Sequence, residues 1–290
     1  MTPGRVRASV VAGLFYPEDP SELAGAVDAL LDLAEPRPAT DVRALVAPHA
    51  GYTFSGPVAA SAFALAPRAA RVVLLGPSHF VPLDGLAVSG ADAWATPLGK
   101  VPVADDLREA ALVAGAVVDD APHARDHALE VELPFLQRAC PDGLEVLPVA
   151  VGHTRPEQVA ALIEALDAFV VVSTDLSHYL DDARARQVDG ETAEAIVRRD
   201  PGAIGDDAAC GVFALRGLVE HARKRDLEVE LLDLCTSADT GGGPERVVGY
   251  GAFAVSSLSR HPVSDTSGSA SAVSIDERAN VPEGVGLFEP

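Results

Sequence analysis

At 290 residues, with 48% hydrophobic and 22% charged side chains, the chain has the composition of a globular protein large enough for an α/β domain. Its formal net charge of −21 and isoelectric point near 4.6 argue against binding nucleic acid through a basic face. No apolar stretch approaches the length of a membrane span and no signal-peptide pattern opens the chain, so we expect a cytoplasmic protein that does not bind membranes.

The positive charge is carried almost entirely by arginine, because Lys100 and Lys224 are the only lysines. An acidic, lysine-poor surface suits a salt-rich cytoplasm, in which screening weakens the repulsion between like charges. Salt adaptation is therefore our hypothesis for the setting of the protein. The three cysteines show no C-x-x-C spacing, which fits free thiols in a reduced compartment.

The first predicted helix follows Pro20, with Ser21 as its N-cap. A buried strand over 42–47 comes next, and it stops at a proline that is followed directly by His49. We then expect a loop through Tyr52 and Ser55 and a helix rich in small residues over 58–65.

The most distinct strand covers residues 71–76, where an apolar run ends at Gly-Pro and His79 follows. The same arrangement recurs at 169–173, an apolar run followed by Asp175 and His178. In open α/β sheets ligands bind beyond the carboxyl ends of the strands. We therefore expect His49, His79 and His178 to converge at one edge of the sheet.

Between these strands the pattern predicts a hairpin-like excursion over 81–105 that carries Trp94, and a helix over 106–114. A group of histidines and acidic residues follows at 123–132. We expect His127 and Glu130 to lie on one face of a helix, since they are spaced i, i+3. His-x-x-Glu is also a metal-ligand spacing.

The remaining predicted elements alternate in type: strand 144–152, helices 156–166, 184–199 and 208–223, and strands 227–234 and 247–255. This alternation predicts a single three-layer α/β domain over 1–259, with a mixed, largely parallel central sheet. Residues 260–290 are rich in serine and glycine and show no periodicity, so we expect a flexible C-terminal tail.

A further candidate donor, beside the three histidines, is Cys210, which precedes a glycine and opens a helical pattern. A helix N-terminus favours the thiolate. Imidazoles with a thiolate suit zinc, copper or iron, and a site with few protein ligands leaves positions open. A metal-free Cys–His nucleophile is the alternative that these residues leave open.

Several blocks of the chain together resemble the Memo family. They are VAGLFYP (11–17), APHAGYTFSGPVAA (47–60), LLGPSHF (74–80), W-TPLG (94–99), DHALEVELPFLQ (126–137), STDLSHY (173–179), ACG (209–211) and VVGYGAFAV (247–255). They span nearly all of residues 6–258, in order.

The resemblance implies a fold similar to the catalytic subunit of class III extradiol dioxygenases, which use non-haem iron. It implies that His49, His79 and Cys210 bind a metal, with Fe(II) first and Cu or Zn as alternatives. It also implies catalytic roles for Asp175, His178 and His127. Cys210 stands where true extradiol dioxygenases use a carboxylate.

We therefore expect a Memo-like metal-dependent oxidoreductase with a dioxygenase-like site and a small-molecule substrate. The alternative is a non-catalytic module that binds a ligand or peptide beside a vestigial metal site. No nucleic-acid or membrane partner is expected.

Overall fold

The computed structural model describes residues 4–37, 41–67, 71–140 and 143–257. Within these residues, nine strands form one mixed sheet. Their order is β10 (His178–Leu180), β12 (Val247–Ser256), β2 (Val42–Ala47), β9 (Phe169–Ser173), β3 (Arg71–Gly76), β8 (Glu145–Val151), β4 (Leu86–Val88) and β7 (Val117–Val118), and β11 (Glu228–Thr236) pairs with β12. The four middle strands β2, β9, β3 and β8 are parallel, and antiparallel strands flank them on both sides.

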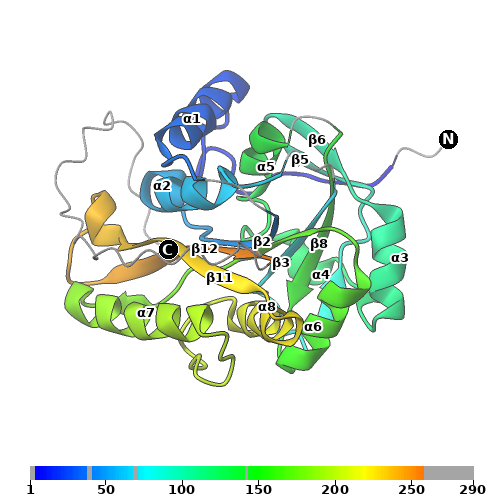
Figure 1. Cartoon of the computed structure of the whole chain (residues 1–290). Coiled ribbons are helices and arrows are strands. Elements are labelled where there is room, and N and C mark those ends of the chain that lie inside the picture. The colour runs from blue at the N-terminus through cyan, green and yellow to red at the C-terminus, as the bar shows by residue number, and fades with distance from the viewer. Residues whose placement is uncertain (1–3, 38–40, 68–70, 141–142, 258–290) are drawn as a thin grey trace. The chain divides into compact units, whose positions relative to one another are not determined.

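Helices cover both faces of this sheet, which confirms the predicted three-layer α/β architecture (Figure 1). One layer contains α1 (Pro20–Leu33), α2 (Tyr52–Phe63) and α5 (Leu133–Ala139). The opposite layer contains α6 (Pro156–Ala165), α7 (Asp182–Val197) and α8 (Val212–Arg225). The shorter helices α3 (Asp105–Val113) and α4 (Ala121–Ala124) lie beside β8 in Figure 1, and a 3-10 turn, η1 (Ser237–Thr240), follows β11.

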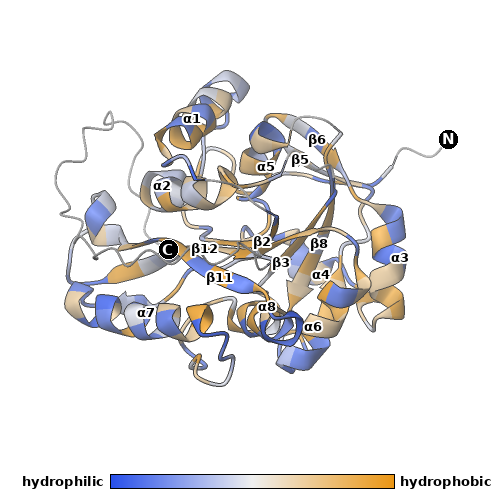
Figure 2. Ribbon diagram, viewed as in Figure 1, coloured by the Kyte–Doolittle hydropathy of each residue, from blue (hydrophilic) through white to orange (hydrophobic). Residues whose placement is uncertain are grey.

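The middle strands form the core because their side chains are apolar on both faces. Residues 72–75 of β3 are all completely buried. Figure 2 shows apolar residues concentrated in the sheet and on the helix faces toward it, with polar residues on the outer faces. Such burial contributes about 25 cal/mol per Å² of apolar surface removed from water.

A second, small sheet consists of β1 (Val6–Arg7), β5 (Ala93–Thr96) and β6 (Gly99–Pro102). Strands β5 and β6 are the predicted hairpin, and Trp94 on β5 is buried, with the Arg7 guanidinium 4.1 Å from its ring centroid.

Three helix starts differ from the prediction. Asp19, not Ser21, caps α1, because its side chain accepts hydrogen bonds from the backbone N–H groups of Ser21 and Glu22. Helix α2 begins at Tyr52 rather than at 58, so Tyr52 and Ser55 are buried in a helix and not in a loop. Its first N–H, that of Tyr52, donates to the carbonyl of Phe15, which anchors the helix start to the N-terminal segment.

Helix α5 begins only at Leu133, with a proline in its first turn. His127 and Glu130 consequently lie in the turns before the helix and do not share a helix face. Their side chains contact different parts of the molecule, as described below.

Among the described residues, no helix combines the length and apolarity needed to cross a bilayer. The chain divides after Leu258 into two units. The tail predicted for 260–290 lies outside the described residues.

Candidate metal centre

The parallel strands β2, β3 and β9 end at the same edge of the sheet, and the predicted site residues follow them there. Ala47 at the end of β2 pairs with Ser173 at the end of β9. The N–H of Thr174 donates to the Ala47 carbonyl, and the N–H of His49 donates to the Asp175 carboxylate at 2.8 Å. The loops after two neighbouring strands are thus joined directly.

Three imidazoles meet at this edge. Donor atoms of His49, His79 and His127 all lie within 4.8 Å of one another. The His79 and His127 rings stack with centroids 5.0 Å apart, and the His49 ring stands nearly perpendicular to both. Two of the three histidines predicted to converge, His49 and His79, belong to this group, whereas His178 does not, and His127 joins them from the segment before α5.

Hydrogen bonds fix the orientation of two of these rings. Nδ1 of His79 lies 3.0 Å from the Asp126 carboxylate, which also accepts from the His79 N–H. Nδ1 of His49 lies 2.7 Å from Ser173 Oγ. Because Nδ1 is engaged in each case, Nε2 is the nitrogen available to a metal, the arrangement common in metal sites.

His127 is held by packing. Its ring lies 4.6 Å from the Phe15 ring, and its Nδ1 is 4.0 Å from the Asp126 carboxylate. The neighbouring Glu130 points elsewhere: its fully buried carboxylate accepts from Arg7, Tyr16 and two backbone N–H groups. Glu130 thus anchors the N-terminal segment that carries Phe15.

Cys210 lies next to His49, with Sγ 3.3 Å from Nε2, although it is not a member of the three-nitrogen group. Its sulfur also accepts from the Asp175 N–H at 3.3 Å. The following Gly211 packs tightly against Thr174: a Cβ there would lie 2.8 Å from the Thr174 Cβ. This close approach brings the start of α8 onto the β9 loop.

Asp175 and His178 complete the predicted set. His178 Nδ1 donates to the Leu176 carbonyl at 2.8 Å, so in the neutral imidazole the lone pair is on Nε2. The loop is held from α7 by the buried Asp189, which accepts from both the N–H and the hydroxyl of Ser177.

Burial favours the neutral form of His49 and of His127. It lowers the pKa of His49 well below its usual range, with a further contribution from the neighbouring imidazoles, and it lowers the pKa of His127 to about 4. Burial also raises the pKa of Asp175 to about 6. Neutral imidazoles present lone pairs, which is the state that a metal ligand needs.

The thiol behaves differently from the prediction based on the helix dipole. Burial, followed by the charge of Asp175, raises the pKa of Cys210 to about 12. The metal-free protein therefore holds a neutral thiol, which weighs against the metal-free nucleophile.

Sequence reasoning did not find Ser173, Asp189 or Phe15 as parts of the site. Ser173 is the last residue of an apolar strand, and only its position beside Ala47 could have indicated contact with the loop of His49. Phe15 contacts His127 across more than a hundred residues, for which a single sequence offers no signal.

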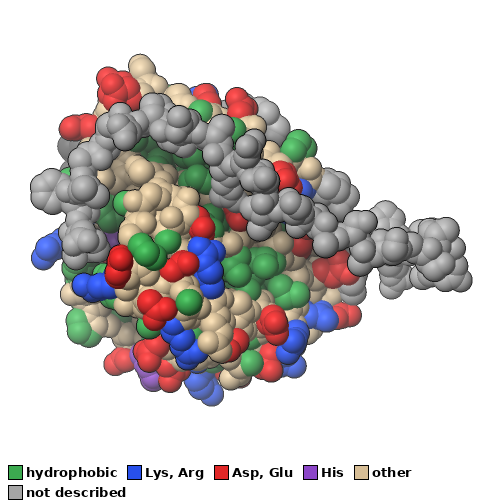
Figure 3. Space-filling view, turned by 90° about the vertical axis from the view of Figure 1, so that its left-hand side faces the viewer, with side chains coloured by type: hydrophobic (Ala, Val, Ile, Leu, Met, Phe, Trp, Pro, Cys, Tyr) green, Lys and Arg blue, Asp and Glu red, His purple; other side chains and the backbone are tan. Residues whose placement is uncertain are grey.

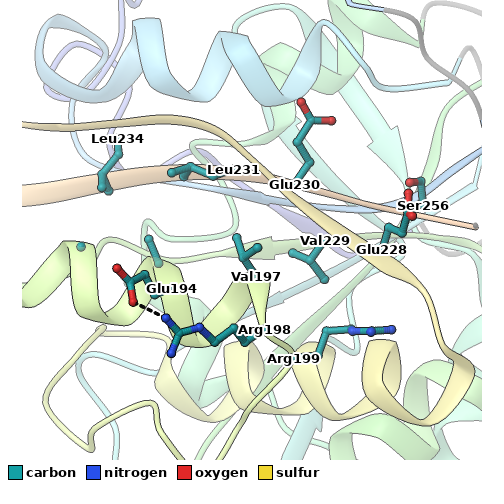
Figure 4. Close-up of a pocket in the computed structure, with 12 residues that line it drawn as sticks. Glu194, Val197, Arg198, Arg199, Glu228, Val229, Glu230, Leu231, Leu234 and Ser256 are labelled. Atoms are coloured by element: carbon teal, nitrogen blue, oxygen red, sulfur yellow. Dashed lines mark hydrogen bonds and ion pairs between the residues drawn. The ribbon is translucent and has the colours of Figure 1, made fainter. Parts of the chain in front are cut away.

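A separate hollow of about 840 Å³ lies between α7 and β11 (Figure 4). Its lining includes Val197, Val229 and Leu231, together with an ion pair between Arg198 and Glu194. The lining contains no histidine or cysteine, so this hollow is not part of the histidine cluster.

The fold and the cluster define an α/β protein with a histidine-rich candidate metal site at the carboxyl edge of its parallel strands. A family model described as Memo-like protein matches residues 7–254, and the chain belongs to the Memo family. A MEMO1 family protein of Aquifex aeolicus is 34% identical over 261 residues, which cover 85% of this chain and 97% of that protein. One of Methanosarcina barkeri is 33% identical over 266 residues, covering 86% and 100%.

Proposed function

We propose that this Memo family protein binds a redox-active metal through His49 and His79 and acts as an oxidoreductase on a small-molecule substrate. The observation that carries the proposal is the group of three histidine donors within 4.8 Å of one another. The donors fit such an ion, because nitrogen ligands suit iron, copper and zinc. We place Fe(II) first, in keeping with the resemblance to non-haem iron dioxygenases, and Cu or Zn as alternatives.

Two residues are candidates for the third donor. The geometry favours His127, because it belongs to the three-nitrogen group. The resemblance to the Memo family favours Cys210, whose sulfur lies 3.3 Å from His49 Nε2. Since a bound metal deprotonates a coordinating thiol, the high pKa of Cys210 does not exclude it. Metal affinities of His127→Ala and Cys210→Ala decide between them, because the true ligand causes the larger loss.

His178 and Asp175 would accept protons from the substrate or donate protons to it. An iron or copper ion bound here would supply one-electron chemistry toward dioxygen and substrate. His178, with its free Nε2, is the proposed general base. Asp175, whose pKa is raised to about 6, receives the His49 N–H and sits between the His49 and Cys210 segments, where it would hold or release a proton near neutral pH.

Exposed aromatic side chains favour a second candidate, a non-catalytic module that binds a ligand or peptide. Phe80 and Tyr179 are each about half exposed beside His79 and His178. Such rings commonly provide contact area at binding surfaces.

Oxygen uptake separates the two candidates. Protein loaded anaerobically with Fe(II) is mixed with a panel of catechols in an oxygen electrode. An oxidoreductase consumes oxygen with at least one substrate, and His178→Ala abolishes this uptake while retaining most of the metal. A metal-loaded protein that never consumes oxygen beyond the level of free Fe(II) would favour the binding module.

A further inference from the structure

Glu132 is a buried carboxyl group that the proposed function does not use. It lies directly before α5 and is completely inaccessible to solvent. Its Oε1 is 2.7 Å from Ser173 Oγ. Within the described part of the chain, its Oε2 has no hydrogen-bond partner. A buried carboxylate in this position would leave a negative charge largely uncompensated, which is strongly unfavourable.

Ser173 Oγ has three close partners, each at 2.7 Å: the Ala128 carbonyl, Nδ1 of His49 and Oε1 of Glu132. A hydroxyl has one hydrogen to donate and two lone pairs that accept. The Ala128 carbonyl can only accept, so its contact requires the hydrogen of Ser173. The two other contacts then need hydrogens from His49 and from Glu132.

We propose that Glu132 is an un-ionised carboxylic acid that donates to Ser173 and so fixes the proton of His49 on Nδ1. This is the one assignment in which each contact of Ser173 contains a hydrogen. It leaves the lone pair of His49 on Nε2, the atom nearest to Cys210. Glu132 is thus a positioning residue that acts through Ser173, and its effect on metal binding rests on the proposed function.

The hydrogen-bond partners of Glu132 differ from those of a second buried glutamate. Glu130, two residues earlier, is also completely buried, but it accepts from the Arg7 guanidinium, the Tyr16 hydroxyl and the N–H groups of Val10 and Val11. Four donors stabilise a carboxylate there. For Glu132, burial raises the pKa of the carboxyl well above its usual range, and the charge of Asp175 raises it further.

Infrared spectroscopy tests the protonation state without any metal. Chelator-treated protein, with carbon-13 in the glutamate carboxyls to separate them from Asp175 and Asp189, is measured in heavy water near neutral pH. The carbonyl band of an un-ionised glutamic acid should be present in wild type and absent from Glu132→Gln. Glu130→Gln, the matched control, should retain it. A wild-type spectrum without this band, or a band that survives in Glu132→Gln, overturns the proposal.

Metal affinity tests the positioning role. Glutamine keeps a hydrogen for Ser173, whereas methionine, of similar size, has none. Glu132→Gln should therefore bind Co(II), followed by its absorption, within about threefold of wild type, and Glu132→Met about tenfold more weakly. Equal loss in both variants, or none in either, overturns the role. If wild type binds no Co(II), the proposed function fails, while the infrared result still decides the protonation of Glu132.

Discussion

His123 is a buried histidine outside the donor cluster. It is 2% exposed, its Nε2 donates to the Ala87 carbonyl at 3.1 Å, and its ring lies against Trp94. Burial lowers its pKa from 6.5 to about 4. The folded protein thus resists protonation at a position where the unfolded chain does not.

The pH dependence of stability follows from this difference. Between pH 6.5 and about 4 the unfolded state binds a proton that folded His123 does not, so the free energy of unfolding falls as the pH falls. His123 should contribute a loss of about 3 kcal/mol over this range. The variant His123→Gln stays neutral and can still donate to Ala87. Its free energy of unfolding, measured with urea, should therefore fall by about 3 kcal/mol less than that of wild type between pH 6.5 and about 4. Parallel curves for the two proteins would contradict the assignment.

At the scale of single residues, the sequence located the ends of strands better than the contacts between side chains. His49, His79 and His178 could be predicted because each follows an apolar run, and parallel strands end at one edge. The hydrogen bonds of Ser173 to His49 and Glu132 join segments more than forty residues apart. The choice of third donor depends on the side-chain directions of His127 and Cys210, which no local pattern determines.

The start of α1 is a test at the scale of an element. Asp19 accepts from two N–H groups of the first turn, and Ser21 lies inside the helix. Asp19→Ala should lower the free energy of unfolding by about 1 kcal/mol, because it removes both bonds and a negative charge near the positive end of the helix dipole. Ser21→Ala is the matched control and should change stability by less than about 0.5 kcal/mol. If urea unfolding shows that Ser21→Ala lowers the free energy of unfolding more than Asp19→Ala does, Ser21 is the cap of α1 and the assignment of Asp19 is wrong.

Strands were easier to predict than helix boundaries. Apolar runs predicted β2, β3 and β9 with nearly their observed bounds, and a glycine or proline closes the first two. Helix α2 includes Pro57 in its interior, although the local preference of a proline is against this position, because it removes a hydrogen bond from the helix. Tertiary contacts, such as the Tyr52 N–H to the Phe15 carbonyl, outweigh that local preference.

The whole molecule carries a large excess of negative charge. On the face shown in Figure 3, acidic and basic side chains are interspersed rather than separated into patches. The net charge of −21 nevertheless produces a mean repulsion that destabilises the compact state.

Added salt should therefore stabilise the protein. Raising KCl from about 0.1 to about 1 M shortens the screening length from about 10 to about 3 Å, which weakens repulsion between surface carboxylates. The melting temperature at neutral pH should rise by several degrees. Close to the isoelectric point of about 4.6 the same addition should have much less effect. A melting temperature that falls with KCl at neutral pH would contradict the proposed salt adaptation.

The metal content of the purified protein tests the proposed centre most directly. Wild type, His49→Ala, His79→Ala and the control His153→Ala, whose side chain is exposed and is not a member of the three-histidine group, are purified without chelator, loaded with Fe(II) and desalted. Elemental analysis should find near-stoichiometric iron in wild type and His153→Ala and little in His49→Ala or His79→Ala. Equal iron in all four proteins, or none in wild type, would contradict a metal centre at this edge of the sheet.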